Sequence, residues 1–268
     1  GAIVGAMLAI AGATYQGVFR NPLADPYLLG VSSGAGLGAT LAIVVGGAAA
    51  SGAVPPAAFA GGMIAVLATI ALGRSVGGGR SEVVIILAGV AVAAFASAIQ
   101  TFFMQRHDDT LRQVYSWMLG RLTTDGWAEV QRVLPYVIVA IAVIALFRRM
   151  LDVMAVGDVE AATLGIAPAR VRLILISVAT LGTAAVVSVS GLIGFVGIVI
   201  PHAVRMLIGP GHRLLLPVSL LVGAAFLVLA DIVARTAMSP AELPIGVVTA
   251  AIGAPFFMLV LRRSRGQI

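Results

Sequence analysis

Long apolar runs dominate this sequence and limit what it can fold into. A helix that crosses a bilayer needs about 20 mostly apolar residues. Nine runs of roughly this kind lie along the chain, at Gly1–Phe19, Leu28–Gly47, Ala53–Leu72, Val83–Phe103, Val133–Phe147, Leu173–Val189, Gly194–Ile208, Leu214–Ala234 and Ile245–Leu261. Only 10% of the residues are charged and the mean hydropathy is +1.09, which argues against both a soluble domain and a disordered chain. The sequence therefore predicts an all-α polytopic membrane protein with about nine spans.

Missing residue types exclude several kinds of chemistry. All 17 basic residues are Arg, so the chain has no Lys for a Walker A phosphate loop or a Schiff base. It has no Cys for a thiolate or an iron–sulfur cluster, and His107, His202 and His212 follow no metal-binding spacing. A net charge of +6 fits Arg-rich loops beside anionic lipid better than nucleic-acid binding. We expect no catalytic residues, no metal site and no nucleic acid.

The arginines predict an orientation in the membrane. If the first run crosses from outside to inside, 12 of the 17 Arg lie at inner ends or loops and 5 lie outside, as the positive-inside rule requires. This orientation places the C-terminus, from Arg262 onward, in the cytoplasm. The membrane we expect is the bacterial inner (cytoplasmic) membrane. Gly1 opens inside an apolar run with no charged n-region or cleavage site, which is not a signal peptide. We expect at least one further helix upstream.

Two connections are longer than turns. The outer one, Gln105–Arg132, carries Tyr115, Trp117 and Trp127, and these aromatic residues predict an interfacial helix near Leu111–Leu119.

The inner connection, Met150–Arg172, has a helical pattern that Gly157, Gly165 and Pro168 break into short pieces. It is either a solvated connector or a docking segment for a partner. Its small apolar residues would suit a partner's groove: Val153, Met154, Val156, Ala161 and Leu164.

Few charges lie inside the runs. Asp231 and Arg235 are four residues apart on one helix face and can pair. Arg205, after His202, can reach toward the head groups. Ion-coupled carriers usually need a series of carboxylates near the middle of the membrane, and the runs show no such series. The pattern favours an external energy source and a large, partly apolar solute. Asn21, Pro22 and Asp25 predict a turn in which Asp25 caps the next helix.

Four blocks of sequence resemble one known family. GAMLAIAGATYQGVFRNPLADPYLLGVSSGAGLGA (Gly5–Ala39), WMLG (Trp117–Gly120), the block from Gly191 to Arg235 and ELPIGVVTAAIGAPFF (Glu242–Phe257) are similar to the iron-chelate and cobalamin permeases of ABC importers, the FecCD type or type II. The resemblance implies a ten-helix permease fold, here without its first helix. It implies one permease domain over 1–268, with a cytoplasmic coupling-helix segment at 151–172.

The resemblance also implies partners. The permease would pair as a homodimer or with a sister chain, bind two ATPase subunits that hold ATP and Mg²⁺, and receive cargo from an extracytoplasmic solute-binding protein. The chain would hold no cofactor and would not be an enzyme by itself.

The resemblance assigns three groups of site residues. The ATPase-docking group is Asp152, Gly157, Glu160, Ala161, Leu164 and Gly165. The inner gate is Gly79, Ser81, Glu82 and Val83, where Glu82 and Val83 depart from the hydroxyl residues of some relatives. Arg235 would dock the binding protein, and its pairing with Asp231 is the alternative.

The predicted function is import of a ferric siderophore, with haem or cobalamin as alternatives, by ATP-driven alternating access. Siderophores stand first only because iron chelates are the commonest cargo of the family. His107 lies near the outer mouth, and we expect it to be a loop residue rather than a haem ligand. Two alternatives stay open, a secondary transporter of an apolar solute without an ATPase and a membrane scaffold without transport.

Overall fold

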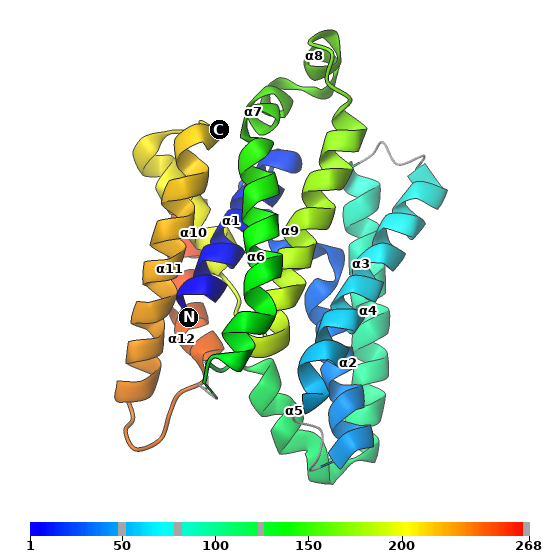
Figure 1. Ribbon diagram of the computed structural model, residues 1–268, viewed down its shortest axis with the longest axis vertical. Coiled ribbons are helices and arrows are strands. Elements are labelled where there is room, and N and C mark those ends of the chain that lie inside the picture. The colour runs from blue at the N-terminus through cyan, green and yellow to red at the C-terminus, as the bar shows by residue number, and fades with distance from the viewer. Residues whose placement is uncertain (48–51, 78–81, 123–125, 265–268) are drawn as a thin grey trace.

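The computed structural model describes residues 1–47, 52–77, 82–122 and 126–264, and helices account for most of them (Figure 1). The nine long helices are α1 (Ala2–Val18), α2 (Val31–Gly46), α3 (Val54–Gly77), α4 (Glu82–Arg106), α6 (Ala128–Leu146), α9 (Pro168–Ser190), α10 (Val196–Ile208), α11 (His212–Thr236) and α12 (Ile245–Ser264). Shorter elements connect them: η1 (Pro26–Leu29), η3 (Asp108–Thr110), α5 (Leu111–Met118), α7 (Arg148–Val156) and α8 (Asp158–Thr163).

Among the described residues, one long helix overlaps each of the nine predicted apolar runs, so the predicted helical architecture is confirmed. Five of these helices, α3, α4, α6, α9 and α11, are long and apolar enough to cross a membrane, whereas α1, α2, α10 and the described apolar part of α12 are shorter. Several helices extend past the predicted apolar runs. For example, α9 starts at Pro168 because proline suits the first helical position, where its missing N–H costs no hydrogen bond. Apolar sequence marks the part of a helix at membrane depth, whereas caps decide where the helix ends.

Helix α1 forms the centre of the bundle. Its residues from Val4 to Val18 are all buried, and it packs against α9, α10 and α11. Glycines allow the closest approaches, since a Cβ atom at Gly12 would overlap the backbone of Gly197 in α10, and one at Gly5 would overlap Gly223 in α11. In membranes such contact between small residues replaces the hydrophobic drive that packs soluble helices.

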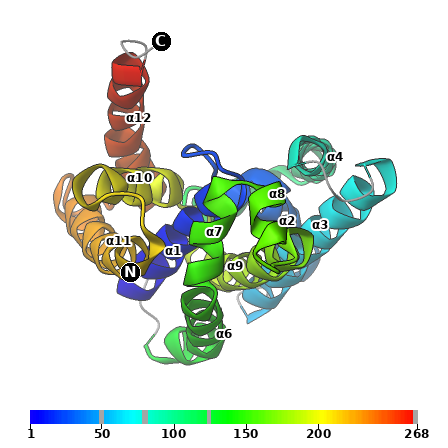
Figure 2. The ribbon, with the colours of Figure 1, turned by 90° about the horizontal axis from the view of Figure 1, so that it is seen from above.

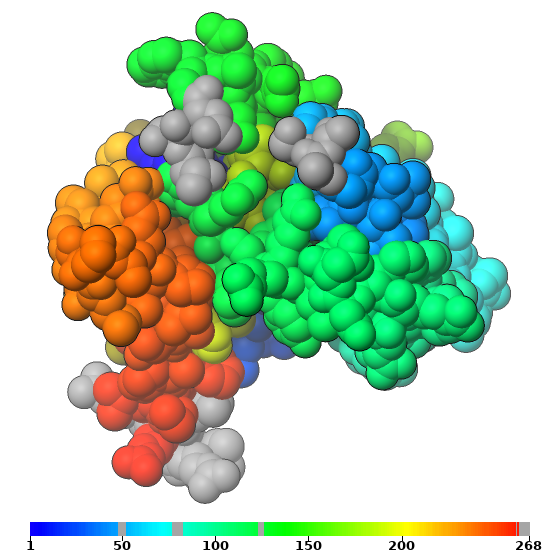
Figure 3. All heavy atoms as spheres, turned by 90° about the horizontal axis from the view of Figure 1, so that it is seen from below, coloured from blue at the N-terminus to red at the C-terminus, as the bar shows by residue number. Residues whose placement is uncertain are grey.

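The two ends of the bundle differ in what lies there. At one end, which we call the α8 end, lie α7 and α8 and the end of α12 (Figure 1). At the other, which we call the α5 end, α5 lies between α11 and the α2–α3 pair (Figure 3). Helix α5 covers most of the helix predicted at Leu111–Leu119, so a helix there is confirmed, and its interfacial position stays a prediction.

The sides of the bundle are also unequal. Viewed along the bundle, α12 projects from the body and α4 lies at the other edge of the same side, while α6 lies on the opposite side (Figure 2). Helix α12 packs mainly against α10 and α11, and its Gly246 N–H donates to the Leu119 carbonyl at 3.0 Å. Phe95 and Leu87 of α4 and Met258 of α12 are exposed apolar side chains, so this side leaves large apolar surface uncovered.

Two connecting segments meet inside the bundle, and the first of them contains η1. Segment 19–30 follows α1, and segment 191–195 precedes the short helix α10. The hydroxyl of Tyr27 donates to the Ile193 carbonyl (3.1 Å) and accepts from the Ile193 N–H (3.3 Å). These bonds satisfy backbone groups that would be costly to leave unpaired away from water.

Candidate functional site

The connection between α6 and α9 is two short helices set apart by glycines. Gly157 lies between α7 and α8 with a φ of 152°, and a Cβ there would overlap the carboxylate of Glu160. Gly165, with a φ of 79°, follows α8, and Pro168 begins α9. The predicted breaks at all three residues are confirmed. Glycine adopts the backbone angles at 157 and 165 without strain, and Pro168 takes the first position of α9, where a missing N–H costs no hydrogen bond.

Charged side chains fasten α8 to the bundle. Both carboxylate oxygens of Asp158 accept hydrogen bonds from Nη2 of Arg172 in α9, each at 3.1 Å. Arg20, just after α1, lies 3.6 Å from the same carboxylate. The side chain of Arg172 is 5% exposed, so this ion pair is shielded from water on one side. A motion of α8 would therefore be transmitted to α9 and to the end of α1.

A second carboxylate fastens α7. Asp152 accepts from the backbone N–H of His212 at 2.8 Å and lies 2.7 Å from the Nδ1 atom of the same residue. His212 is the first residue of α11, so Asp152 satisfies a backbone donor that the helix itself leaves free. Leu151 and Met154, on the same short helix, are fully buried. Asp152 thus joins α7 to α11.

The tip of the connection exposes apolar side chains. Val156, Val159 and Leu164 are 73%, 74% and 70% exposed. Of the residues assigned to ATPase docking, Glu160, Leu164 and Gly165 are exposed, whereas Gly157 and Ala161 are buried. The sequence analysis did not include Val159 among the docking residues. The feature that could have indicated it is an apolar residue placed between two acidic ones, Asp158 and Glu160.

The predicted inner gate lies only partly within the described residues. Gly79 and Ser81 are outside them. Glu82 is the first residue of α4, and Val83 is exposed. Farther along α4, a Cβ at Gly89 would overlap the Leu28 carbonyl, so the helix backbone touches the segment before α2 there.

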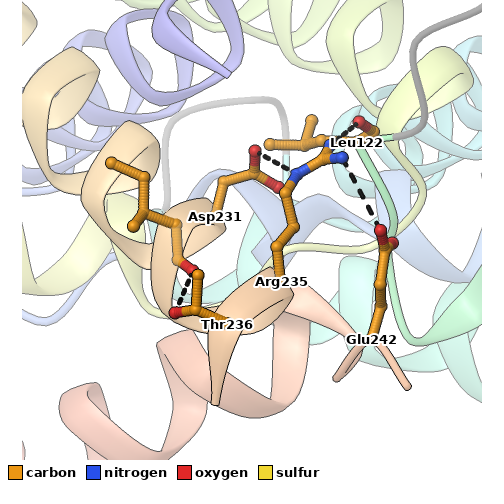
Figure 4. A network of polar contacts seen from close by, with 6 residues as sticks. Leu122, Asp231, Arg235, Thr236 and Glu242 are labelled. Carbon is orange, nitrogen blue, oxygen red and sulfur yellow. Dashed lines mark hydrogen bonds and ion pairs between the residues drawn. The ribbon is translucent and has the colours of Figure 1, made fainter. Parts of the chain in front are cut away.

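Arg235 is held at the α5 end by groups from three segments (Figure 4). Its Nε donates to Asp231 at 2.9 Å, its Nη2 donates to the Leu122 carbonyl at 2.6 Å, and its Nη1 lies 3.7 Å from Glu242. The predicted pair with Asp231 is confirmed. Leu122 and Glu242 were missed because Leu122 is far away in the sequence and Glu242 lies in the loop after α11, where helical spacing no longer applies.

A polar contact inside the bundle replaces another expectation. Arg205 was expected to reach toward the head groups, and the structure shows its Nη1 donating to Oε1 of Gln16 in α1 at 2.7 Å. The Gln16 Nε2 donates to the carbonyls of Gly197 and Ile198, each at 3.3 Å. Pro201 has no N–H to offer the Gly197 carbonyl four residues before it, so Gln16 supplies the missing donor.

The N-terminal side of η1 behaves as predicted. The Asp25 carboxylate accepts from the Tyr27 N–H at 2.7 Å and caps η1. Burial raises the pKa of this carboxyl to about 6, although the hydrogen bond from Tyr27 acts in the opposite direction. Within the described residues, no group of three or more His, Asp or Glu side chains is placed to hold a metal ion.

These features define a polytopic helical membrane protein in which the connection between α6 and α9 carries two short helices at one end of the bundle. The chain belongs to the FecCD transport family, whose model matches residues 1–263. It is thus a membrane permease of the ABC-importer type.

Named relatives agree with this class. The chain is 46% identical to the cobalamin import system permease protein BtuC of Halobacterium salinarum, over 98% of this chain and 70% of that protein. It is 40% identical to the hemin transport system permease protein HmuU of Yersinia pestis, over 99% and 80% of the two chains. It is 37% identical to the Fe(3+) dicitrate transport system permease protein FecD of Escherichia coli, over 98% and 81%.

A solved structure has the same fold. It is described as an inward-facing conformation of a metal-chelate type ABC transporter, is 33% identical and superposes with a TM-score of 0.88 over 98% of this chain and 83% of that one. The alternatives of a secondary transporter and a scaffold are therefore disfavoured.

Proposed function

We propose that this chain is the permease subunit of an importer that carries a metal-centred chelate or macrocycle into the cytoplasm. The observation that carries the proposal is the match over nearly the whole chain to permeases named for cobalamin, haem and ferric citrate. Ferric siderophores remain within this class. The 46% identical relative is named for cobalamin, and for that reason cobalamin is the first cargo to test.

The α8 end faces the cytoplasm in this proposal and binds an ATPase subunit, which supplies ATP and Mg²⁺. Exposed apolar side chains at an aqueous end favour a partner's groove. Val156, Val159 and Leu164 form such a surface, and we call it the apolar tip. The contacts of Asp158 and Asp152 with α9 and α11 would carry its movement into the spanning helices, giving alternating access.

A second copy of the chain would pack against the side that carries α4 and α12. Its exposed apolar residues and the sparse packing of α12 support a homodimer with the path between the copies. The inner gate would then lie at Gly79–Val83 before α4. At the opposite end, Arg235 would dock an acidic residue of the solute-binding protein by exchanging its contact with Glu242.

The test is cargo uptake by the host after deletion of the gene. Labelled cobalamin, ferric siderophore and haem are each supplied with and without depletion of ATP. We expect loss of one cargo only, restored by the parent gene and not by a Val159→Asp copy, which carries a charge in the apolar tip. Uptake that persists after deletion, or that follows the proton gradient rather than ATP, would contradict the proposal.

A further inference from the structure

A groove opens between α3 and α6 at the α5 end. Its volume is about 580 Å³, and its walls come from Pro55, Pro56 and Phe59 of α3, from Arg132 and Tyr136 of α6, and from the end of α9. Helices α3 and α6 each pack against α9, which forms the floor between them. Yellow-green atoms of α9 are visible between the green of α6 and the blue of the α2–α3 region in Figure 3.

The groove carries an aromatic pair and a cation in its walls. The rings of Phe59 and Tyr136 meet at 5.4 Å between centroids and bridge the two walls. Arg132 lies one helical turn before Tyr136, near the start of α6, and Trp127 just before this helix is exposed. Exposed Trp and Tyr beside the first turns of a spanning helix are typical of the level of the lipid head groups.

Arg132 has no counter-charge among the residues that the structure describes. No Asp or Glu of the described residues lies within ion-pair distance of its guanidinium. The lining beside it is otherwise mainly proline, aromatic and aliphatic. A cation against such walls calls for an anion, and a guanidinium binds phosphate with two parallel hydrogen bonds.

The surroundings of the groove decide what can supply that anion. The walls α3 and α6 and the floor α9 are all helices long and apolar enough to cross a membrane. The groove adjoins α6, on the side of the bundle opposite α4 and α12 (Figure 2). An apolar groove that opens sideways from spanning helices faces lipid in either orientation of the protein.

We propose that this groove is a binding site for an anionic phospholipid. The lipid phosphate pairs with Arg132, and the glycerol and upper acyl chain lie against Pro56, Phe59 and the end of α9. The site is independent of the cargo path and of the apolar tip. Ordinary annular lipid, by comparison, would show no preference for head-group charge.

The test is native mass spectrometry of the full chain released from mixed phosphatidylglycerol and phosphatidylcholine. The parent should retain phosphatidylglycerol selectively. Arg132→Gln should reduce that retention about fivefold, the effect of one basic residue on anionic lipid, while Arg132→Lys keeps part of it. Arg112→Gln removes another exposed cation of the α5 end and serves as the matched control, with retention unchanged.

Val189→Trp provides a second variant, because it fills the groove from its floor and leaves Arg132 in place. It should also lower phosphatidylglycerol retention. Equal retention of both lipids by the parent, or full retention by both Arg132→Gln and Val189→Trp, would overturn the proposal. Loss of the lipid on forming a dimer would likewise overturn it, since a second copy would then occupy the groove.

Discussion

The α8 end and the α5 end both place charges beside the spanning helices, but they use them differently. At the α8 end Asp152 and Asp158 hold short helices down, and the apolar tip is left exposed. At the α5 end Arg235 is surrounded by Asp231, Glu242 and the Leu122 carbonyl. One end leaves an apolar surface exposed, whereas the other already satisfies its central cation. The proposed function accordingly assigns an apolar contact to the first end and an exchange of ion pairs to the second.

The largest expected effect comes from removing the anchor of α8. Asp158→Ala leaves the buried guanidinium of Arg172 without its bidentate carboxylate, and we expect the free energy of unfolding to fall by about 2 kcal/mol, less than for a fully buried pair because Asp158 is partly exposed. Thermal unfolding of the purified protein in detergent measures this. Asp108→Ala, an exposed carboxylate of the α5 end, is the control. An equal melting temperature for parent and Asp158→Ala would show that the pair does not anchor α8.

The next effect separates docking from stability. Val159→Asp places a charge in the apolar tip, and the ATPase retained on copurification should fall at least tenfold, with the melting temperature unchanged because Val159 makes little internal contact. Tyr115→Asp, at an exposed position of α5, should leave ATPase retention as in the parent. If both variants retain the ATPase equally, the apolar tip is not the docking surface.

The third effect tests the exchange of partners at the α5 end. Arg235→Gln should weaken binding of the solute-binding protein to the reconstituted permease about fivefold, as expected for a partly exposed ion pair. Glu242→Gln removes the competing carboxylate and should strengthen the same binding by a similar factor. Surface plasmon resonance on nanodiscs measures both. Changes of the same sign in the two variants would exclude the exchange.

The smallest expected effect is a pH dependence of the free energy of unfolding that comes from Asp25. Because burial raises the pKa of Asp25 to about 6, the folded state binds this proton more tightly than the unfolded state does. Stability from this group should therefore fall as the pH rises from about 4 to about 6, and level off above that. Asp25→Asn keeps an acceptor for the Tyr27 N–H and should remove this slope. Melting curves across the range, with Asp25→Ala as the variant that loses the cap, decide it.

Much of this architecture was predictable from local pattern. Apolar runs predicted the nine long helices, and Gly157, Gly165 and Pro168 predicted the breaks around α8, because glycine and proline act through backbone angles that depend on their own position. The Asp231–Arg235 pair followed from helical spacing. The contact of Gln16 with Arg205 did not, since it joins helices far apart in the sequence.

The candidate sites were predicted less completely than the helices. Composition left the connection after α6 open between a solvated connector and a docking segment, and the family resemblance favoured docking. Neither could say that Ala161 faces inward and Val159 faces outward. Two short helices can turn in many ways, and the pairing of Asp158 with Arg172 selects one of them. The groove beside Arg132 gave no signal in the sequence, because it depends on α3 and α6 standing apart over α9.

By itself, the sequence determined the class of protein, the number of long helices and the family, since hydropathy and short motifs are local properties. The tertiary structure decided which charged side chains form ion pairs inside the protein and which apolar side chains stay exposed. These outcomes depend on distances between helices separated by many residues, and only packing sets such distances.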